Sequence, residues 1–291
     1  MIIVTGGTGR LGAQIVDRLL DRVPAERVGV SVRDPGRAGD LAARGVRVRH
    51  GDFTDPHSLG EAFEGATQVL IVSTNRTGEA ATAQHIAAID AARDAGAGRI
   101  LYTSHQGAAA DSVFAPMLDH AATESYLSRT RTPFTALRNG FYADTVRLLI
   151  GRALETGELV APADGPVSWT AHADLAEAAA IVLADEGRFD GPTPPLTAPN
   201  ALDLDAIAGV LTELTGHPIR RVVADDAEWA ATLTGRGVPA DRASMLIDMF
   251  RAARRGEFAT TGHALEDVLR RPATPIRSIL EEAADPSMIR M

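Results

Sequence analysis

The sequence has no cysteine and no lysine, since all 29 basic residues among its 291 are arginine. Without cysteine the chain can form no disulfide bond, no thiolate metal site and no cysteine nucleophile. Without lysine it can form no Schiff base, no P-loop lysine contact and no catalytic Tyr-x-x-x-Lys pair, because arginine stays protonated. These absences exclude several large classes of enzyme chemistry before any motif is considered.

Positive charge and long hydrophobic runs are also scarce. The net charge of −9 disfavours general binding to nucleic acid or to anionic membranes. No apolar run approaches the roughly 18 residues that cross a bilayer. Residues 1–4 lead directly into a glycine loop, and they predict a buried strand instead of a signal peptide. We therefore expect a cytoplasmic protein whose partners are neither nucleic acid nor membrane.

Short, β-rich apolar runs alternate with amphipathic helical stretches through residues 1–140. This alternation predicts a doubly wound parallel sheet, the Rossmann arrangement, with helices on both faces. The predicted strands are 2–5, 27–32, 46–50, 68–73, 99–104 and 134–138, and the predicted helices are 12–22, 37–44, 56–64, 79–95 and 118–129. We assign residues 1–140 to a dinucleotide-binding domain.

Residues 141–291 show a different pattern, in which helical stretches dominate and Pro and Gly separate short extended pieces. The predicted helices are 144–156, 172–184, 204–215, 227–233, 241–254 and 276–284, and the extended pieces are 158–161, 167–169, 195–198 and 219–223. This pattern predicts a smaller, mainly helical substrate lobe over the carboxyl ends of the strands, with residues 167–185 packing back on the first domain.

The glycine loop joins the first strand to the first helix. The strand at 2–5 runs into Gly6-x-x-Gly9-x-x-Gly12. In such a loop the first glycine allows a tight turn, the second lets the backbone approach a pyrophosphate, and the third lets the helix pack against the strand. Free amides and a partial positive charge at the helix N-terminus then attract the phosphates. The dinucleotide-binding residues expected in this loop are Gly6, Thr8, Gly9, Arg10, Leu11 and Gly12.

The second strand ends in Arg33, where a protein that selects NAD usually has an acidic residue. Arginine at this point suits the 2′-phosphate of NADP through charge-assisted contacts, and Arg10 can add to the same pocket. Asp34 follows at once, so we expect NADP and keep NAD as an alternative. Asp52 and Phe53 are expected to hold the adenine, although Asp52 can instead order the turn before the next helix.

Polar residues follow the fourth and fifth strands. In a doubly wound sheet the ligand lies beyond the carboxyl ends of the strands, so these residues are expected to border the nicotinamide half of the cofactor. The alternative is that they only satisfy loop polarity. They are Ser73, Thr74 and Asn75 after the fourth strand, and Thr103 and Ser104 in the fifth. The histidines are scattered without metal-ligand spacing, and we expect no metal.

Several segments taken together carry a resemblance to a known family. They are the glycine loop, the Arg33 strand end, Gly51-Asp52, Tyr102-Thr103-Ser104, Leu137-Arg138-Asn139-Gly140-Phe141-Tyr142, His172-Ala173-Asp174-Leu175-Ala176 and Arg271-Pro272-Ala273-Thr274-Pro275. With these segments the chain resembles the NmrA-like atypical short-chain dehydrogenases, and within them the bacterial NADPH-dependent quinone oxidoreductases, nearly from end to end. The resemblance implies that Asn139, Phe141 and Tyr142 border the nicotinamide and the quinone.

The missing Tyr-x-x-x-Lys pair makes alcohol chemistry unexpected, because ordinary short-chain dehydrogenases use that lysine to lower the pKa of the tyrosine. A quinone needs only orientation against the nicotinamide and a hydrogen-bond donor near its oxygen. Met249 and its neighbours on one late helix face are either core residues or an apolar wall for an aromatic substrate. The candidate donors are His120, Asn139 and Tyr142, and the candidate substrate contacts are Phe141, Tyr142 and Met249.

The leading hypothesis is therefore an NADPH-dependent reductase that transfers hydride to a quinone or a similar conjugated carbonyl. One alternative is a non-catalytic, NAD(P)-binding redox sensor, because the family contains both kinds of protein. A second alternative is an accessory oxidoreductase of aromatic polyketide biosynthesis, which the Arg- and Ala-rich composition suggests. A homodimer is left open.

Overall fold

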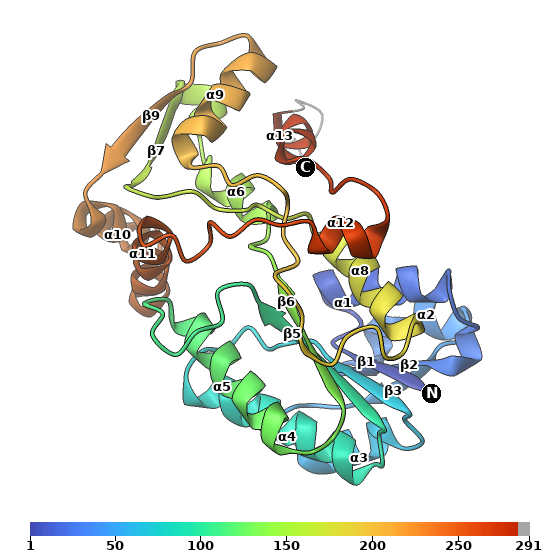
Figure 1. Cartoon of the computed structure of the whole chain (residues 1–291). Helices are drawn as coiled ribbons and strands as arrows, with labels where there is room; N and C mark the ends of the chain where they lie inside the picture. Colours follow the sequence, from blue (N-terminus) through green and yellow to red (C-terminus); the bar gives the residue numbers. More distant parts are fainter. Residues whose placement is uncertain (285–291) are drawn as a thin grey trace.

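The structure, a computed structural model, describes residues 1–284 and is built on a seven-stranded parallel sheet (Figure 1). The strand order is β3-β2-β1-β4-β5-β6-β8, so the chain starts near the middle and winds outward in both directions. The strands are β1 (Ile2–Thr5), β2 (Val28–Val32), β3 (Arg47–His50), β4 (Gln68–Ile71), β5 (Arg99–His105), β6 (Phe134–Asn139) and β8 (Gly191–Pro192). The predicted doubly wound sheet is confirmed.

Two helical layers cover the sheet, because neighbouring residues of a strand face opposite sides. One layer holds α1 (Arg10–Leu20), α8 (His172–Ala184) and α12 (Ala264–Leu269), and the other holds α3 (Pro56–Phe63), α4 (Glu79–Asp94) and α5 (Ala115–Arg129). In β1, Ile2 and Val4 pack with the first layer, and Ile3 packs with the second. The connection from β2 to β3 contains the short helix α2 (Gly39–Ala43).

The second half of the chain forms a smaller, mainly helical lobe, seen in the upper part of Figure 1. Its core is rich in aromatic side chains, among them Trp169, Phe250 and Phe258. Its elements are α6 (Asp144–Leu149), α7 (Ala153–Thr156), β7 (Glu158–Pro162), α9 (Leu204–Thr215), β9 (Arg220–Ala224), α10 (Asp226–Gly235), α11 (Ala240–Arg254) and α13 (Ile276–Ala284). This lobe begins where β6 ends, so it lies at the carboxyl edge of the sheet.

The chain returns from the lobe to the sheet layers more than once. Helix α8 packs along α1, β8 pairs with β6, and α12 packs on α8. A buried carboxylate fixes the last return: Asp174 accepts hydrogen bonds from Arg271 at 2.8 Å and from the Thr274 amide and hydroxyl at 2.6 and 3.0 Å. The two halves of the chain are therefore interlocked by several segments that are distant in sequence.

The structure differs from the sequence-based prediction at five places. The helix predicted at 144–156 is divided into α6 and α7, because Gly151 takes a left-handed conformation with φ +48°. The pieces at 167–169 and 195–198 form isolated bridges, with Leu202 and with Asn139, instead of strands. The strand β8 and the helix α12 were not predicted. With two and six residues respectively, they are too short for a hydrophobic periodicity to be recognised in the sequence.

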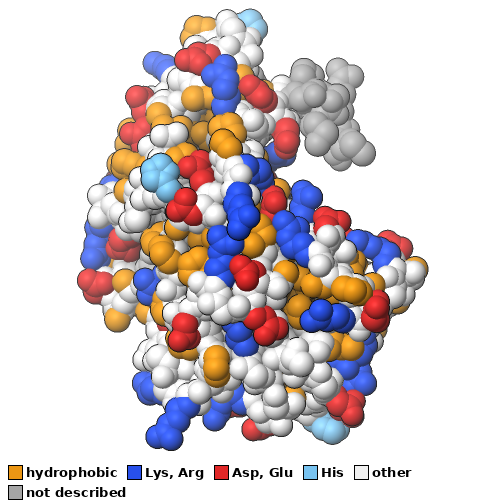
Figure 2. Space-filling view, turned by 45° about the vertical axis from the view of Figure 1, so that its right-hand side comes forward, with side chains coloured by type: hydrophobic (Ala, Val, Ile, Leu, Met, Phe, Trp, Pro, Cys, Tyr) orange, Lys and Arg blue, Asp and Glu red, His pale blue; other side chains and the backbone are white. Residues whose placement is uncertain are grey.

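Charges of both signs are mixed on the face shown in Figure 2, where arginine and acidic side chains alternate with hydrophobic ones. Within residues 1–284, no helix combines the length and the hydrophobicity needed to cross a membrane.

Candidate active site

The glycine loop after β1 forms a tight cradle in which side chains have no room. Gly6 has φ +61°, a conformation that favours glycine, and its amide bonds to the Ser31 carbonyl at 2.9 Å. A Cβ atom on Gly12 would lie 2.2 Å from the Gly6 oxygen, and one on Gly7 would lie 2.6 Å from Val30 Cγ1. The loop therefore brings the first turn of α1 against the end of β1, as a pyrophosphate site requires.

The N-terminus of α1 faces this cradle. Gly9 is the N-cap and contributes no side-chain cap, and the first hydrogen bond of the helix runs from the Ala13 amide to the Gly9 carbonyl at 2.9 Å. The amides that precede Ala13 are thus oriented to bind an anion. Arg10 pairs with Asp144 of α6 at 2.6 Å, and Asp144 also lies 2.5 Å from His172 Nδ1. The contact of Arg10 with the cofactor stays a prediction.

The end of β2 carries the residues that were predicted to distinguish the two nicotinamide cofactors. Arg33 is exposed there, while the Asp34 carboxylate accepts a hydrogen bond from the Gly36 amide at 3.0 Å and so caps the following turn. Asp52 accepts from the amide and the hydroxyl of Thr54, which lowers its pKa, and the charge of Arg33 lowers that pKa further. Asp52 therefore orders the turn before α3, which was the alternative to its contact with adenine. It lies next to the half-buried Phe53 and close enough to Arg33 for the arginine charge to act on it.

The loop that follows β4 is tied to β5 and to α4. Thr103 Oγ1 accepts from the Ser73 amide at 2.8 Å and donates to Ser73 Oγ at 3.1 Å. The Thr74 amide donates to His85 Nε2 at 3.0 Å. Asn75, the third residue predicted in this loop, is exposed. The loop is thus held at the carboxyl edge of the sheet, where a ligand of a doubly wound sheet lies.

Ser104, predicted to bind the cofactor, is buried and occupied by another contact. Its hydroxyl donates to Glu124 at 2.6 Å, and Glu124 also pairs with Arg138 through bonds of 3.0 and 2.6 Å. This bidentate ion pair fastens α5 to β5 and β6. In this structure Ser104 holds the scaffold beneath the site.

A group of histidine and tyrosine rings lies where β5 ends and α5 begins. Tyr102 bonds to His120 Nδ1 at 2.7 Å and lies 3.3 Å from His85 Nδ1. The rings of His105 and His120 are stacked, with centroids 6.2 Å apart, and His105 also contacts the rings of Phe141 and Phe258. His120 is one of the three predicted donors, and the structure surrounds it with groups that were not predicted.

Burial dominates the acid–base properties of this group. It lowers the pKa of His85 to about 4 and that of His105 to about 3, and it lowers the pKa of His120 well below the usual value. Burial also raises the pKa of Tyr102. At neutral pH the three imidazoles are therefore uncharged and the phenol keeps its proton.

These shifts predict a loss of stability in mild acid. The unfolded chain protonates His85 and His105 below about pH 6.5, whereas the folded protein does so only near 4 and 3. Because the unfolded state then binds more protons, each histidine lowers the free energy of unfolding by about 1.4 kcal/mol per pH unit below 6.5. Thermal unfolding between pH 7 and about pH 4 measures this slope.

A matched pair of variants assigns that slope. His105→Asn removes one of the buried histidines whose pKa is lowered, and it should make the pH dependence shallower. His57→Asn, on the exposed surface of α3, should leave it unchanged, since the His57 side chain is 87% exposed. An unaltered slope in the first variant would show that His105 is not buried as an uncharged ring.

Asn139 and its neighbours form the part of the site above β6. Asn139 is buried, and within the described residues its Oδ1 atom has no hydrogen-bond partner. A buried acceptor of this kind calls for a donor from a ligand, and a carboxamide group on a bound nicotinamide is of the right type. Burial raises the pKa of Tyr142, whose ring lies 4.2 Å from that of His172, so its phenol remains a donor at neutral pH.

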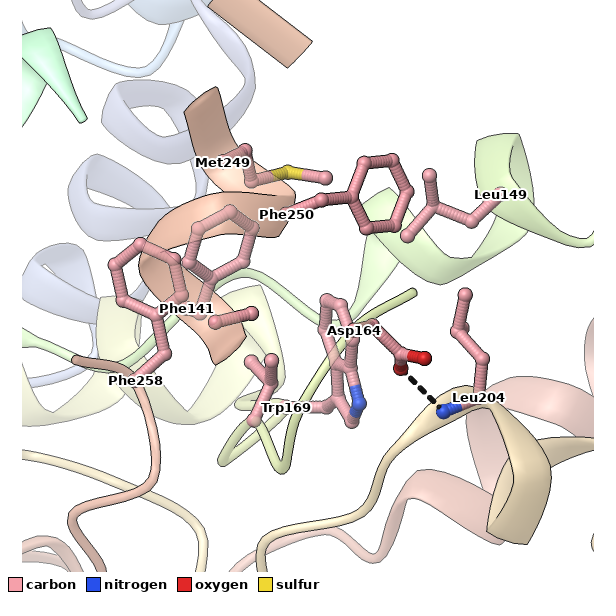
Figure 3. A pocket seen from close by; sticks show the side chains of 10 residues that line it. Phe141, Leu149, Asp164, Trp169, Leu204, Met249, Phe250 and Phe258 are labelled. Atoms are coloured by element: carbon pink, nitrogen blue, oxygen red, sulfur yellow. Dashed lines mark hydrogen bonds between the residues drawn. The ribbon is translucent and has the colours of Figure 1, made fainter. Parts of the chain in front are cut away.

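Phe141 faces a closed aromatic wall in the C-terminal lobe (Figure 3). Met249 of α11 lines this wall and is 5% exposed. The cavity enclosed there is only about 10 Å³, which is far too small for a quinone. Met249 therefore belongs to the core in this structure, and its contact with substrate stays a prediction. The other lining residues are Leu149, Asp164, Val167, Trp169, Leu204, Phe250, Ala253 and Phe258.

Comparison with known proteins agrees with this geometry. The sequence model described as NAD(P)H-binding matches residues 6–186, which include the cradle, the β5 end and α8. The chain belongs to the NAD(P)H-binding family. It is 34% identical to quinone oxidoreductase 2 of Escherichia coli, over 95% of this chain and 96% of that protein. It is also 29% identical to an NmrA-like domain-containing oxidoreductase of Aspergillus flavus, over 97% and 96% of the two chains.

Two crystal structures of reductases share the whole fold. The NADPH-dependent quinone oxidoreductase of Escherichia coli, complexed with NADPH, matches with a TM-score of 0.92 at 31% identity, over 98% of this chain and 100% of that one. The triphenylmethane reductase of Citrobacter sp., complexed with NADP(H), matches with a TM-score of 0.91 at 33% identity, over 97% and 100%. The predicted resemblance to the NmrA-like quinone oxidoreductases is confirmed.

Three residues of the site were missed by the sequence analysis, namely His85, Tyr102 and His105. A signal for the first was present, because Ala81, His85 and Ala88 share the buried face of α4 at helical spacing. Residues two apart in a strand face the same side of the sheet, so Tyr102 and Ser104 of β5 both face the layer that contains α4 and α5. Within residues 1–284, no three acidic or histidine side chains are grouped as a metal site.

Proposed function

We propose that this protein is an NADPH-dependent reductase that transfers hydride to quinones or similar conjugated carbonyls. The proposal rests on one observation: the predicted cofactor-binding and substrate-binding groups lie along the same carboxyl edge of the sheet. The glycine cradle and Arg33 lie beyond β1 and β2, and neutral histidines lie beside Phe141 beyond β5 and β6. Bound NADPH supplies the hydride.

The protein's own residues then have separate tasks. The amides at the N-terminus of α1 hold the diphosphate, and Arg33 selects the 2′-phosphate. Asn139 accepts from the nicotinamide end through its Oδ1 atom, which has no partner among residues 1–284. His120 and Tyr142 donate hydrogen bonds to the quinone oxygen, on which negative charge develops as the quinone accepts a hydride, that is, one proton and two electrons. Location in the cytoplasm and a homodimer stay predictions.

Oxidation of NADPH in the presence of a quinone panel tests the proposal. We expect turnover with at least the simple benzoquinones and naphthoquinones, and slower turnover when NADH replaces NADPH. Calorimetric titration with NADPH alone provides the comparison. Tight NADPH binding without turnover on any quinone would favour a dinucleotide-binding regulator, and the absence of NADPH binding would refute both functions.

A further inference from the structure

Two buried side chains connect a backbone amide to His120. The Thr74 amide lies 3.0 Å from His85 Nε2. His85 Nδ1 lies 3.3 Å from the Tyr102 hydroxyl, and that hydroxyl lies 2.7 Å from His120 Nδ1. A backbone N–H group can only donate, so it fixes the direction of the first hydrogen bond in this chain.

The proton position on His85 follows from that bond. Its Nε2 atom accepts from the amide, so the neutral ring carries its proton on Nδ1. This proton faces the Tyr102 hydroxyl and also Thr123 Oγ1, which is 3.0 Å away. The Thr123 hydroxyl gives its own proton to the Asp119 carbonyl at 2.8 Å, so it acts toward His85 as an acceptor.

The proton position on His120 follows in turn. Protonated His85 Nδ1 cannot accept from Tyr102, so the single proton of the Tyr102 hydroxyl points to its nearest partner, His120 Nδ1, at 2.7 Å. Because Nδ1 accepts, the neutral His120 ring carries its proton on Nε2. His120 remains partly exposed, and within residues 1–284 its Nε2 atom has no protein partner. The Nε2–H group is thus available to a ligand.

His105 shows the same arrangement in a shorter form. The Gly107 amide donates to His105 Nδ1 at 3.0 Å, so this ring also carries its proton on Nε2. Burial and the mutual repulsion of His85, His105 and His120 lower the pKa of His120, which keeps it uncharged. Two carboxylates on the same helix have other partners, since Glu124 binds Arg138 and Asp119 accepts from the Gly78 amide at 2.8 Å.

The chain of hydrogen bonds cannot pass protons to His120. It ends on a peptide N–H, which does not release its proton at ordinary pH, and each group between holds only the one proton it donates. A proton that left His120 Nε2 could not be replaced through Tyr102 and His85. These hydrogen bonds therefore orient the His120 ring, and they do not supply it with protons.

We propose that Tyr102 and His85 are positioning residues that hold neutral His120 as an Nε2–H hydrogen-bond donor to the oxygen of the substrate. The proposal rests on the proposed quinone reduction for the identity of that oxygen. Hydride transfer delivers one proton and two electrons to the quinone, and the product is the hydroquinone anion. The remaining proton then comes from solvent, after His120 has stabilised the anion by its hydrogen bond.

Nuclear magnetic resonance on the full chain tests the tautomer directly. Protein labelled with ¹⁵N-histidine gives a two-bond ¹H–¹⁵N pattern that separates the Nε2–H tautomer from the Nδ1–H tautomer, and the variant His120→Gln assigns the His120 signals. We expect the Nε2–H tautomer at neutral pH in the unmodified protein. The Nδ1–H tautomer, or a doubly protonated ring, would overturn the proposal without the need for any other variant.

The variant Tyr102→Phe tests the positioning role. Loss of the phenol removes the donor to His120 Nδ1, so the ring should become a mixture of the two tautomers. Tyr126→Phe is the matched control, because the Tyr126 hydroxyl donates to Asp90 and takes no part in the hydrogen bonds that lead to His120. An unchanged Nε2–H tautomer in Tyr102→Phe would show that Tyr102 does not fix it.

The same variants separate this proposal from the proposed function. Tyr102→Phe should lower kcat for quinone reduction about 10- to 100-fold, with the Kd for NADPH unchanged, whereas Tyr126→Phe should leave kcat unchanged. If no quinone is reduced by the unmodified protein, the proposed function fails, and the resonance pattern still decides the tautomer of His120. If quinones are reduced and Tyr102→Phe retains full kcat, the positioning role fails alone.

Discussion

The variant Gly12→Ala should lose most of its affinity for NADPH while it remains folded. The added Cβ would lie 2.2 Å from the Gly6 oxygen, well inside the ordinary contact distance of 3.4–4 Å, so α1 must move away from the loop. Such overpacking costs about 1–3 kcal/mol of stability. The displaced helix amides no longer converge on the diphosphate, and we expect the Kd for NADPH to rise by about 100-fold or more.

Gly60→Ala is the matched control for this experiment. Gly60 lies within α3, and a Cβ there would meet no atom within 4 Å. The substitution should raise the thermal stability slightly, because alanine favours a helix by roughly 0.5–1 kcal/mol over glycine. Calorimetric titration and thermal unfolding measure both variants. NADPH binding by Gly12→Ala at the unmodified affinity would place the cofactor elsewhere.

The variant Arg33→Gln should convert a preference for NADPH into near equality with NADH. Arg33 is exposed at the end of β2, whereas the Asp34 carboxylate beside it caps the next turn through the Gly36 amide. Charge-assisted hydrogen bonds to a phosphate contribute about 1.5–3 kcal/mol. The KM for NADPH should therefore rise about 10- to 100-fold, with the KM for NADH unchanged.

Arg44→Gln provides the control for the loss of one positive charge. Arg44 follows α2 and pairs with Asp17 at 2.5 Å, with both side chains about half exposed. Neither KM should change in this variant. If the unmodified protein binds NADH more tightly than NADPH, the role given to Arg33 is wrong.

Most of the sheet could be predicted from the sequence, because parallel strands covered on both faces are continuous apolar runs. The glycine loop was equally visible, since its spacing follows from the close contact between Gly12 and Gly6. The family resemblance added the segment around Asn139 and Tyr142. Each of these signals lies in adjacent residues, which is why one sequence was sufficient to show them.

The histidine group could not be predicted, because its members come from separate elements. His85 of α4, Tyr102 of β5 and His120 of α5 meet only when two crossovers place their helices on the same face of the sheet. The engagement of Arg10 with Asp144 is similar, since it depends on how α6 returns over the glycine loop. Periodicity shows which face is buried, but it does not show which buried side chains become neighbours.

The repeated passage of the chain between the sheet layers and the lobe also has a mechanical consequence. A hinge requires a few connecting segments that can twist together. Here β6 leads into the lobe, α8 leads back, and α12 is clamped to α8 by the contacts of Asp174 with Arg271 and Thr274. A rigid-body rotation of the lobe would strain all of these connections at once, so we expect ligands to enter and leave through local rearrangements of side chains and loops.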